Sequence, residues 1–122
     1  MSTILIVDDS PTVLMSMEQL LRRFGYDVMK ANSAEHAVQT VRATTPDLVI
    51  TDFNMPGANG AELIKGLRSD SRFRFTPMLV LTTELQKARR DEAKAACATG
   101  WLVNPVNPTQ LTGVLKKLLP CG

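Results

Sequence analysis

The sequence predicts an α/β fold in which a parallel β-sheet is covered by helices on both faces. Short apolar runs alternate with segments of helical periodicity five times along the 122 residues. This alternation is typical of parallel sheets, because a helix usually returns the chain to the starting edge between two parallel strands. Most of the strand segments are continuously apolar, as expected for strands that are buried on both faces, whereas the second carries Asp27 and Lys30.

The first elements carry clear boundary signals. Residues 3–7 are a β-branched run of strand length. Ser10 and Pro11 predict a helix start, since serine is a good N-cap and proline fits the first helical turn. Apolar residues at helical spacing then lead to Gly25, which is suited to ending that helix. Residues 26–31 are predicted to form the second strand.

The middle of the chain repeats this pattern. Ser33 is predicted to cap a second helix, which ends before Pro46. Residues 48–51 form the third predicted strand, and the proline and glycine in 54–57 indicate a loop. Apolar residues within 63–67 then predict a helix on the same spacing.

The last two units complete the expected sheet. Residues 78–82 are a continuously apolar run and form the fourth predicted strand. The alanine- and charge-rich segment 84–97 is predicted to be helical, and 101–103 form the fifth strand. Asn107 opens the final helix in a pattern that resembles a capping box.

Composition indicates one soluble globular domain that covers residues 1–122. The formal net charge of +2 is too small to suggest nucleic acid binding. No apolar stretch reaches membrane-spanning length and no leader sequence opens the chain, so we expect a cytoplasmic protein. Cys97 and Cys121 lack metal or redox spacing and are expected to be free thiols. His36 is interpreted as a surface residue of a helix.

Polar residues follow four of the predicted strands. Asp8 and Asp9 follow the first, Asp52 the third, Thr82 the fourth and Asn104 the fifth. In open α/β sheets, ligands bind outside the carboxyl ends of the strands. Three carboxylates in one crevice repel each other unless a cation neutralises them, and hard oxygen ligands suit Mg²⁺. The sequence therefore predicts a magnesium site at this edge.

These motifs, together with the segment Asp52-Phe53-Asn54-Met55-Pro56-Gly57, resemble the receiver domain of bacterial two-component response regulators. The similarity is greatest to the single-domain chemotaxis type, called CheY-like, and it covers the whole chain. The resemblance implies a doubly wound, flavodoxin-like sheet of five parallel strands in the order 2-1-3-4-5.

The resemblance also implies a role for each matching residue. Asp52 matches the phosphoacceptor and Thr82 the switch hydroxyl that bonds the phosphoryl group. Mg²⁺ would be bound by Asp9, Asp52 and the backbone carbonyl of Asn54, with Asp8 acting through a metal-bound water. The protein would then be a phosphoacceptor with possible autodephosphorylation, and not a turnover enzyme.

Two residues depart from the receiver pattern. Asn104 stands where the family has a lysine that pairs with the phosphoryl group, and Val106 replaces an aromatic residue. Trp101 matches an aromatic residue that changes rotamer on activation. The expected switch and partner face consists of Trp101, Lys87, Arg90 and Lys94.

The expected function is a phosphorylation-dependent signalling switch in a two-component or chemotaxis system. A sensor histidine kinase would supply the phosphoryl group to this monomer, and the output partner would be a protein such as a flagellar motor switch or a phosphatase. We expect no separate output domain, because the sequence ends just after the last predicted helix. Because Asn104 replaces the lysine, the switch would be weakened.

Two alternatives stay open on the residues alone. A degenerate receiver would be a constitutive protein-binding module, which Asn104 favours and the intact acidic residues oppose. An enzyme of similar fold would need other motifs. A haloacid-dehalogenase-type phosphatase needs Asp-x-Asp after the first strand, where this chain has Asp8-Asp9-Ser10, and the glycine patterns of nucleotide-binding enzymes are absent.

Overall fold

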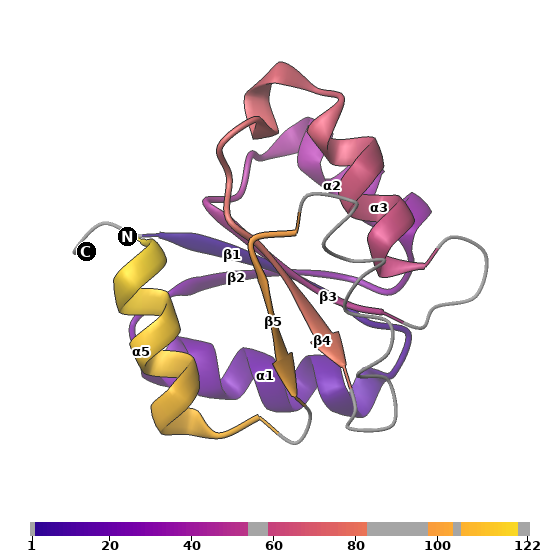
Figure 1. Cartoon of the computed structure of the whole chain (residues 1–122). Helices are drawn as coiled ribbons and strands as arrows, with labels where there is room; N and C mark the ends of the chain where they lie inside the picture. Colours follow the sequence, from indigo (N-terminus) through magenta and orange to yellow (C-terminus); the bar gives the residue numbers. More distant parts are fainter. Residues whose placement is uncertain (1, 54–58, 83–97, 104–105, 120–122) are drawn as a thin grey trace.

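A single parallel sheet forms the middle of the computed structural model (Figure 1). The structure describes residues 2–53, 59–82, 98–103 and 106–119. The sheet order is β2-β1-β3-β4-β5, and every neighbouring pair is parallel. The strands are β1 (Thr3–Val7), β2 (Asp27–Ala31), β3 (Leu48–Asp52), β4 (Met78–Thr82) and β5 (Gly100–Val103). The predicted parallel sheet and its 2-1-3-4-5 order are confirmed.

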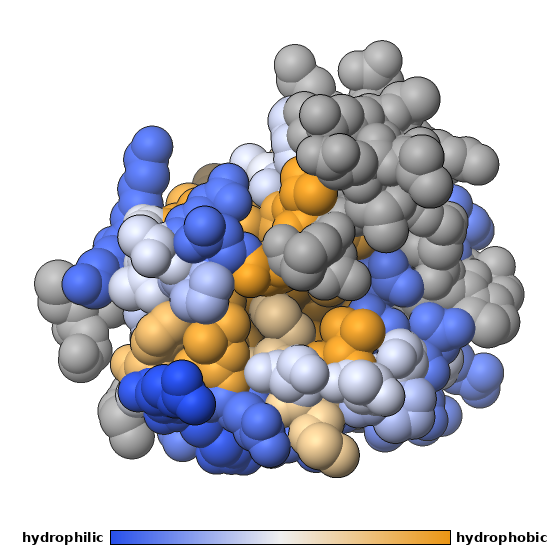
Figure 2. All heavy atoms as spheres, turned by 90° about the horizontal axis from the view of Figure 1, so that it is seen from below, coloured by the Kyte–Doolittle hydropathy of each residue, from blue (hydrophilic) through white to orange (hydrophobic). Residues whose placement is uncertain are grey.

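Helices cover both faces of this sheet, as predicted. The helices are α1 (Pro11–Arg23), α2 (Ala34–Ala43), α3 (Gly60–Arg68) and α5 (Pro108–Leu118), with a short 3₁₀ helix η1 (Ser71–Phe73). In Figure 1, α1 and α5 lie below the sheet, whereas α2 and α3 lie above it. Seen from below, apolar residues gather in the middle of the α1 and α5 face, with hydrophilic residues at the upper left and along the lower margin (Figure 2). The predicted helix 84–97 lies outside the described residues.

Alternate residues of each strand serve two separate cores. Leu5 and Val7 of β1 belong to the core under α2 and α3. Ile4 and Ile6 of the same strand belong to the core under α1 and α5. Because side chains alternate across a strand, a sheet with two buried faces requires apolar residues at every position. This requirement explains the continuous apolar runs.

Local capping signals decide where the first two helices begin and end. The Ser10 hydroxyl accepts a bond from the Val13 amide at 3.4 Å, and the Ser33 hydroxyl accepts one from His36 at 3.0 Å. Gly25 follows the last turn of α1 with a φ of 93°, a conformation that suits glycine. Its amide bonds to the Arg22 carbonyl at 3.0 Å, which closes the end of the helix.

A complete capping box lies at α3, where none is predicted from the sequence. There the Asn59 side chain accepts from the Glu62 amide at 2.9 Å, and the Glu62 carboxylate accepts from the Asn59 amide at 3.3 Å. In α5 the Asn107 side chain accepts from the amides of Thr109 and Gln110. The predicted limits of β1 and β4 match the observed ones. Those of β2, β3 and β5 differ by one residue at one end, which is the usual uncertainty at element ends.

A cluster of bonds at the amino edge of the sheet holds the chain between α3 and β4. The Arg68 guanidinium donates to the carbonyls of Phe73 and Thr76, both at 2.6 Å. Phe73 itself is fully buried in the core under α2 and α3. This connection fixes where β4 enters the sheet and therefore where its carboxyl end emerges.

Candidate functional site

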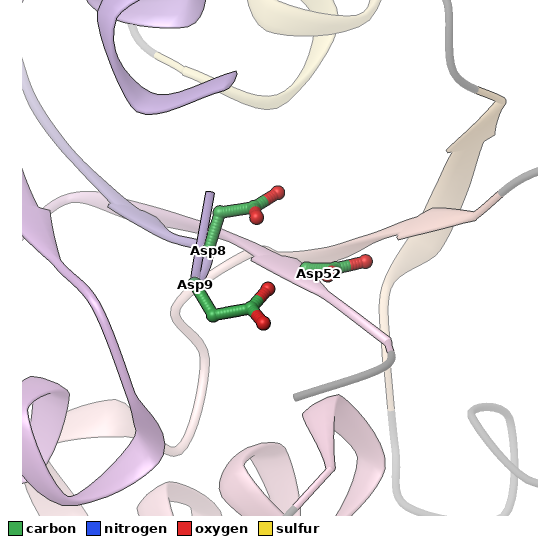
Figure 3. A group of neighbouring side chains, drawn as sticks. All are labelled: Asp8, Asp9 and Asp52. Atoms are coloured by element: carbon green, nitrogen blue, oxygen red, sulfur yellow. The ribbon is translucent and has the colours of Figure 1, made fainter. Parts of the chain in front are cut away.

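Three carboxylates meet at the carboxyl edge of β1 and β3. These strands are parallel neighbours with Val7 opposite Thr51, so the residues that follow, Asp8 and Asp52, emerge side by side. One carboxylate oxygen from each of Asp8, Asp9 and Asp52 lies within 4.8 Å of the others. Figure 3 shows the three side chains projecting to the same side. The convergence expected from the sequence is observed.

The three acids differ in their environments. Asp8 is buried, Asp52 is half-buried and Asp9 is exposed. Burial raises the pKa of Asp8, and the neighbouring Asp9 adds to this effect, while a 2.9 Å bond from the Ser10 amide to the Asp8 carboxylate opposes it. The site therefore holds a carboxylate whose charged form is destabilised, which favours binding of a cation.

The raised pKa of Asp8 makes stability depend on pH. The folded state holds this proton more tightly than the unfolded chain does, so the free energy of unfolding falls as the pH rises through the folded pKa. The stability that the protonated Asp8 contributes is fully present below pH 3.8, the ordinary pKa of an aspartate. We therefore expect Asp8→Asn to be more stable than the parent near neutral pH without Mg²⁺, and this advantage to disappear in acid.

Thermal melts across the acidic and neutral range check this expectation. The asparagine side-chain oxygen can still accept the bond from the Ser10 amide, so the substitution tests the charge and not the hydrogen bond. Repeating the melts with millimolar Mg²⁺ is the control, because a bound cation offsets the same repulsion. Identical pH profiles for the parent and Asp8→Asn would contradict the electrostatic account.

The donor set fits Mg²⁺. This ion binds oxygen ligands at about 2.0–2.1 Å, so two oxygens on one ion are at most about 4.2 Å apart. One oxygen of each carboxylate lies within 4.8 Å of the other two, so the side chains need to approach each other only slightly to share one ion. Mg²⁺ is usually held by one or two carboxylates with several waters, which matches two direct carboxylate ligands and a third carboxylate that acts through a bound water.

The backbone around Asp52 is held from three directions. The Phe53 amide donates to the Leu81 carbonyl of β4 at 3.1 Å, and the Thr51 hydroxyl donates to the Asp52 carbonyl at 3.0 Å. The Gly60 amide, at the start of α3, donates to the Phe53 carbonyl at 2.8 Å. Neither Thr51 nor Gly60 was singled out from the sequence. The sequence signal that could have identified Gly60 is a glycine directly after Asn59, the N-cap of α3.

The remaining predicted residues fall at the same edge or outside the described part. Thr82 ends β4, opposite Val103 of β5, so its backbone is one position beyond the Leu81 that pairs with Asp52. Trp101 lies on β5 with 37% of its surface exposed. The residues outside the described part are Asn54, Lys87, Arg90, Lys94 and Asn104.

Two further expectations concern the rest of the molecule. His36 is exposed on α2, and its ring nitrogen Nδ1 lies 3.2 Å from the Asn32 amide, in agreement with a surface role. No helix in the part of the chain that the structure describes is long and apolar enough to cross a membrane. Val106, which departs from the receiver pattern, is partly buried against the core under α1 and α5.

A doubly wound parallel sheet with an acidic cluster where β1 and β3 end defines a receiver-type signalling domain. Residues 4–116 match the response regulator receiver domain, and the chain belongs to this family. The resemblance drawn from the motifs is therefore confirmed.

Known relatives that the chain matches along nearly their whole length include chemotaxis proteins. Chemotaxis protein CheY1 of Helicobacter pylori is 39% identical over 118 residues, which cover 95% of each chain. Protein PilH of Pseudomonas aeruginosa is 33% identical and covers 98% of both chains. The solved structure of chemotaxis protein CheY4 of Vibrio cholerae has a TM-score of 0.91 at 39% identity, covering 98% of this chain and 99% of that one.

The chain is thus a CheY-like receiver domain of the two-component signalling proteins. Receiver domains are signalling proteins and not turnover enzymes in the ordinary sense, in keeping with the expectation from the sequence.

Proposed function

We propose that this protein is a phosphorylation-dependent switch that accepts a phosphoryl group on Asp52 and signals through protein contacts. The observation that carries the proposal is the convergence of Asp8, Asp9 and Asp52 within 4.8 Å at the carboxyl edge of the sheet. Asp52 is the half-buried member, on the last position of β3, where a carboxylate is both held in place and reachable.

The chemistry follows from this arrangement. A carboxylate oxygen of Asp52 attacks the phosphorus of a phosphohistidine or a small phosphodonor, the bond to the leaving group breaks, and an acyl phosphate forms. Asp9, Asp52 and the backbone carbonyl of Asn54 would hold Mg²⁺, with Asp8 acting through a bound water. The metal supplies positive charge that reduces repulsion between the carboxylate and the phosphoryl oxygens. Thr82 then donates a hydrogen bond to the transferred group.

The proposed partners are proteins. A sensor histidine kinase supplies the phosphoryl group to this single receiver domain, which we expect to act as a monomer. The output is a contact with another protein, such as a flagellar motor switch or a phosphatase, because the relatives include chemotaxis proteins. Trp101, exposed on β5, and the basic residues Lys87, Arg90 and Lys94 form the proposed switch and partner face.

Phosphorylation of the purified protein tests the proposal. The protein is incubated with a small phosphodonor, with and without Mg²⁺, and its intact mass is measured. We expect a gain of one phosphoryl group only when Mg²⁺ is present, and loss of that group on treatment with hydroxylamine, as for an acyl phosphate. A protein that gains no phosphoryl group under these conditions would instead be a degenerate receiver.

The degenerate receiver is the second candidate, and Asn104 is the observation that favours it. A neutral amide cannot form the ion pair that a lysine forms with the phosphoryl group. A charge-assisted hydrogen bond contributes about 1.5–3 kcal/mol, against roughly 0.5–1.5 kcal/mol for a neutral one. The deficit of about 1–2 kcal/mol weakens the switch, while the metal ligands and nucleophile, which are other residues, remain.

The variant Asn104→Lys is therefore expected to strengthen the switch more than the phosphorylation step. A deficit of this size corresponds to about a tenfold change in the active population. The variant should bind the phosphoryl mimic beryllofluoride about tenfold more tightly, and the fluorescence of Trp101 should change more on binding. Titration of both proteins with beryllofluoride in the presence of Mg²⁺ measures both quantities.

A matched variant tests whether the effect depends on where the positive charge is added. Gln39 is exposed on α2, so Gln39→Lys adds the same charge on a different element. This control should bind beryllofluoride as the parent does. Equal responses from Asn104→Lys and the parent would show that this protein does not need the lysine.

A further inference from the structure

We infer that Gly60 is a positioning residue for Asp52: the absence of a side chain lets the first turn of α3 press against the Asp52–Phe53 peptide and direct the carboxylate toward Asp8 and Asp9. The inference rests on the proposed function, since it explains how the phosphoacceptor is aimed. Gly60 does not touch the phosphoryl group in this proposal and acts only through Asp52.

The contact between Gly60 and this peptide leaves no room for a methyl group. A Cβ atom added at Gly60 would lie 2.5 Å from the Asp52 carbonyl oxygen and 3.1 Å from the Phe53 Cα atom. Both neighbours are backbone atoms, which cannot rotate away as the end of a side chain can. An ordinary contact begins near 3.4 Å, so the peptide or the helix would have to move.

Several interactions keep α3 from moving away from the sheet. The capping box between Asn59 and Glu62 closes the first turn of the helix. Leu63, Ile64 and Leu67 are buried in the core under α2 and α3. Native cores are closely packed, so moving the helix outward would open contacts along its whole buried face. The displacement is therefore expected to fall on the Asp52–Phe53 peptide.

The Asp52–Phe53 peptide is also bonded on its other sides, so a side chain added at Gly60 would rotate the peptide and not simply shift it. Phe53 is 1% exposed, and its amide is bonded to Leu81 of β4. The Thr51 hydroxyl donates to the same Asp52 carbonyl that a Cβ atom at Gly60 would meet. Because the carbonyl belongs to Asp52 itself, a rotation of this peptide turns the Asp52 side chain relative to Asp8 and Asp9.

Metal binding measures this orientation without any turnover. Residues that orient metal ligands typically change metal affinity by about 10–100-fold when mutated. We expect Gly60→Ala to raise the Mg²⁺ dissociation constant at least about tenfold, measured by calorimetry at a temperature where thermal melts show the variant to be folded. The rate of phosphorylation by a small phosphodonor should fall with it at limiting Mg²⁺.

Gly66→Ala is the matched control in the same helix. A Cβ atom at Gly66 meets nothing within 4 Å. Alanine is a better helix former than glycine, so this variant should melt at a higher temperature and bind Mg²⁺ as the parent does. The comparison separates a general effect of replacing glycine in α3 from the specific contact with Asp52.

The outcomes distinguish positioning from a purely structural role. If Gly60→Ala melts at a lower temperature but binds Mg²⁺ as tightly as the parent, Gly60 only supports the fold and the inference is overturned. If Gly60→Ala does not fold, variants at Thr51 provide the test. Thr51→Val should weaken Mg²⁺ binding and Thr51→Ser should restore most of the affinity, because the Thr51 hydroxyl holds the same carbonyl.

Equal Mg²⁺ binding by Thr51→Val and the parent would overturn the inference in that case. The parent protein tests the proposed function separately. A parent that binds no Mg²⁺ overturns both the proposed metal site and this inference. A parent that binds Mg²⁺, together with a folded Gly60→Ala that binds it equally, overturns the inference alone.

Discussion

Replacing Asp52 with asparagine is expected to abolish phosphorylation that is labile to hydroxylamine. The reason is chemical, since an amide cannot supply the carboxylate oxygen that attacks phosphorus and forms the acyl phosphate. Asp8 and Asp9 lie within 4.8 Å of Asp52 but are not expected to substitute for it. Asp8 is 4% exposed, and both are needed as partners of the metal in the proposed site.

Intact-mass measurement after incubation with a small phosphodonor and Mg²⁺ gives the result directly. Asp27→Asn is a suitable control, because Asp27 is exposed and begins β2, at the other edge of the sheet. This variant should be phosphorylated as the parent is. Melting temperatures show that both variants are folded. Hydroxylamine-labile phosphate on folded Asp52→Asn would mean that another carboxylate is the acceptor.

Replacing Asp9 with alanine is expected to remove the stabilisation by Mg²⁺. An ion that binds only the folded state, at a hundredfold excess over its dissociation constant, adds about 2.7 kcal/mol to the free energy of unfolding. Asp9 is the exposed member of the cluster and makes little contribution to the core, so its loss should leave the fold intact. The parent should therefore melt at a higher temperature with Mg²⁺, and Asp9→Ala should not.

Melting curves at increasing Mg²⁺ concentration measure this difference, with Asp27→Ala as the variant matched for charge. Asp27→Ala should gain as much from Mg²⁺ as the parent does. Removing Asp9 also removes repulsion of Asp8, so without Mg²⁺ the variant should be at least as stable as the parent. A parent whose melting temperature does not respond to millimolar Mg²⁺ would argue against the metal site.

The strands and helix starts were predictable because their signals are local. Ile4 and Leu5 lie in a continuous apolar run, which by itself indicates a strand buried on both faces. Ser10 and Ser33 cap helices by accepting bonds from amides three residues further along the chain.

The capping-box pattern at the last helix is borne out in the bond from the Gln110 amide to the Asn107 side chain. The complete box at α3, formed by Asn59 and Glu62, is not predicted. Short polar motifs of this kind occur at several places in a chain, so the sequence alone does not show which of them forms a complete capping box.

The candidate site was partly predictable for a different reason. Asp8, Asp9 and Asp52 follow apolar strands, and parallel strands bring their carboxyl ends to one edge whatever the details of packing. The strand order that makes β1 and β3 neighbours came from the family resemblance and was confirmed by the sheet. The contact of Gly60 with Asp52 was not predictable, because it depends on how closely α3 approaches the sheet.

The amino-acid sequence by itself therefore determined the five strands, the helix caps and the acidic residues that occupy the edge of the sheet. Tertiary structure alone decided that Asp8 is buried with a raised pKa. It decided too that the Thr51 hydroxyl bonds the Asp52 carbonyl and that Gly60 lies close against this carbonyl. It also decided that Arg68 fixes the entry of β4. Hydrophobic periodicity and capping act over a few residues, whereas desolvation and close contact arise only when distant segments pack together.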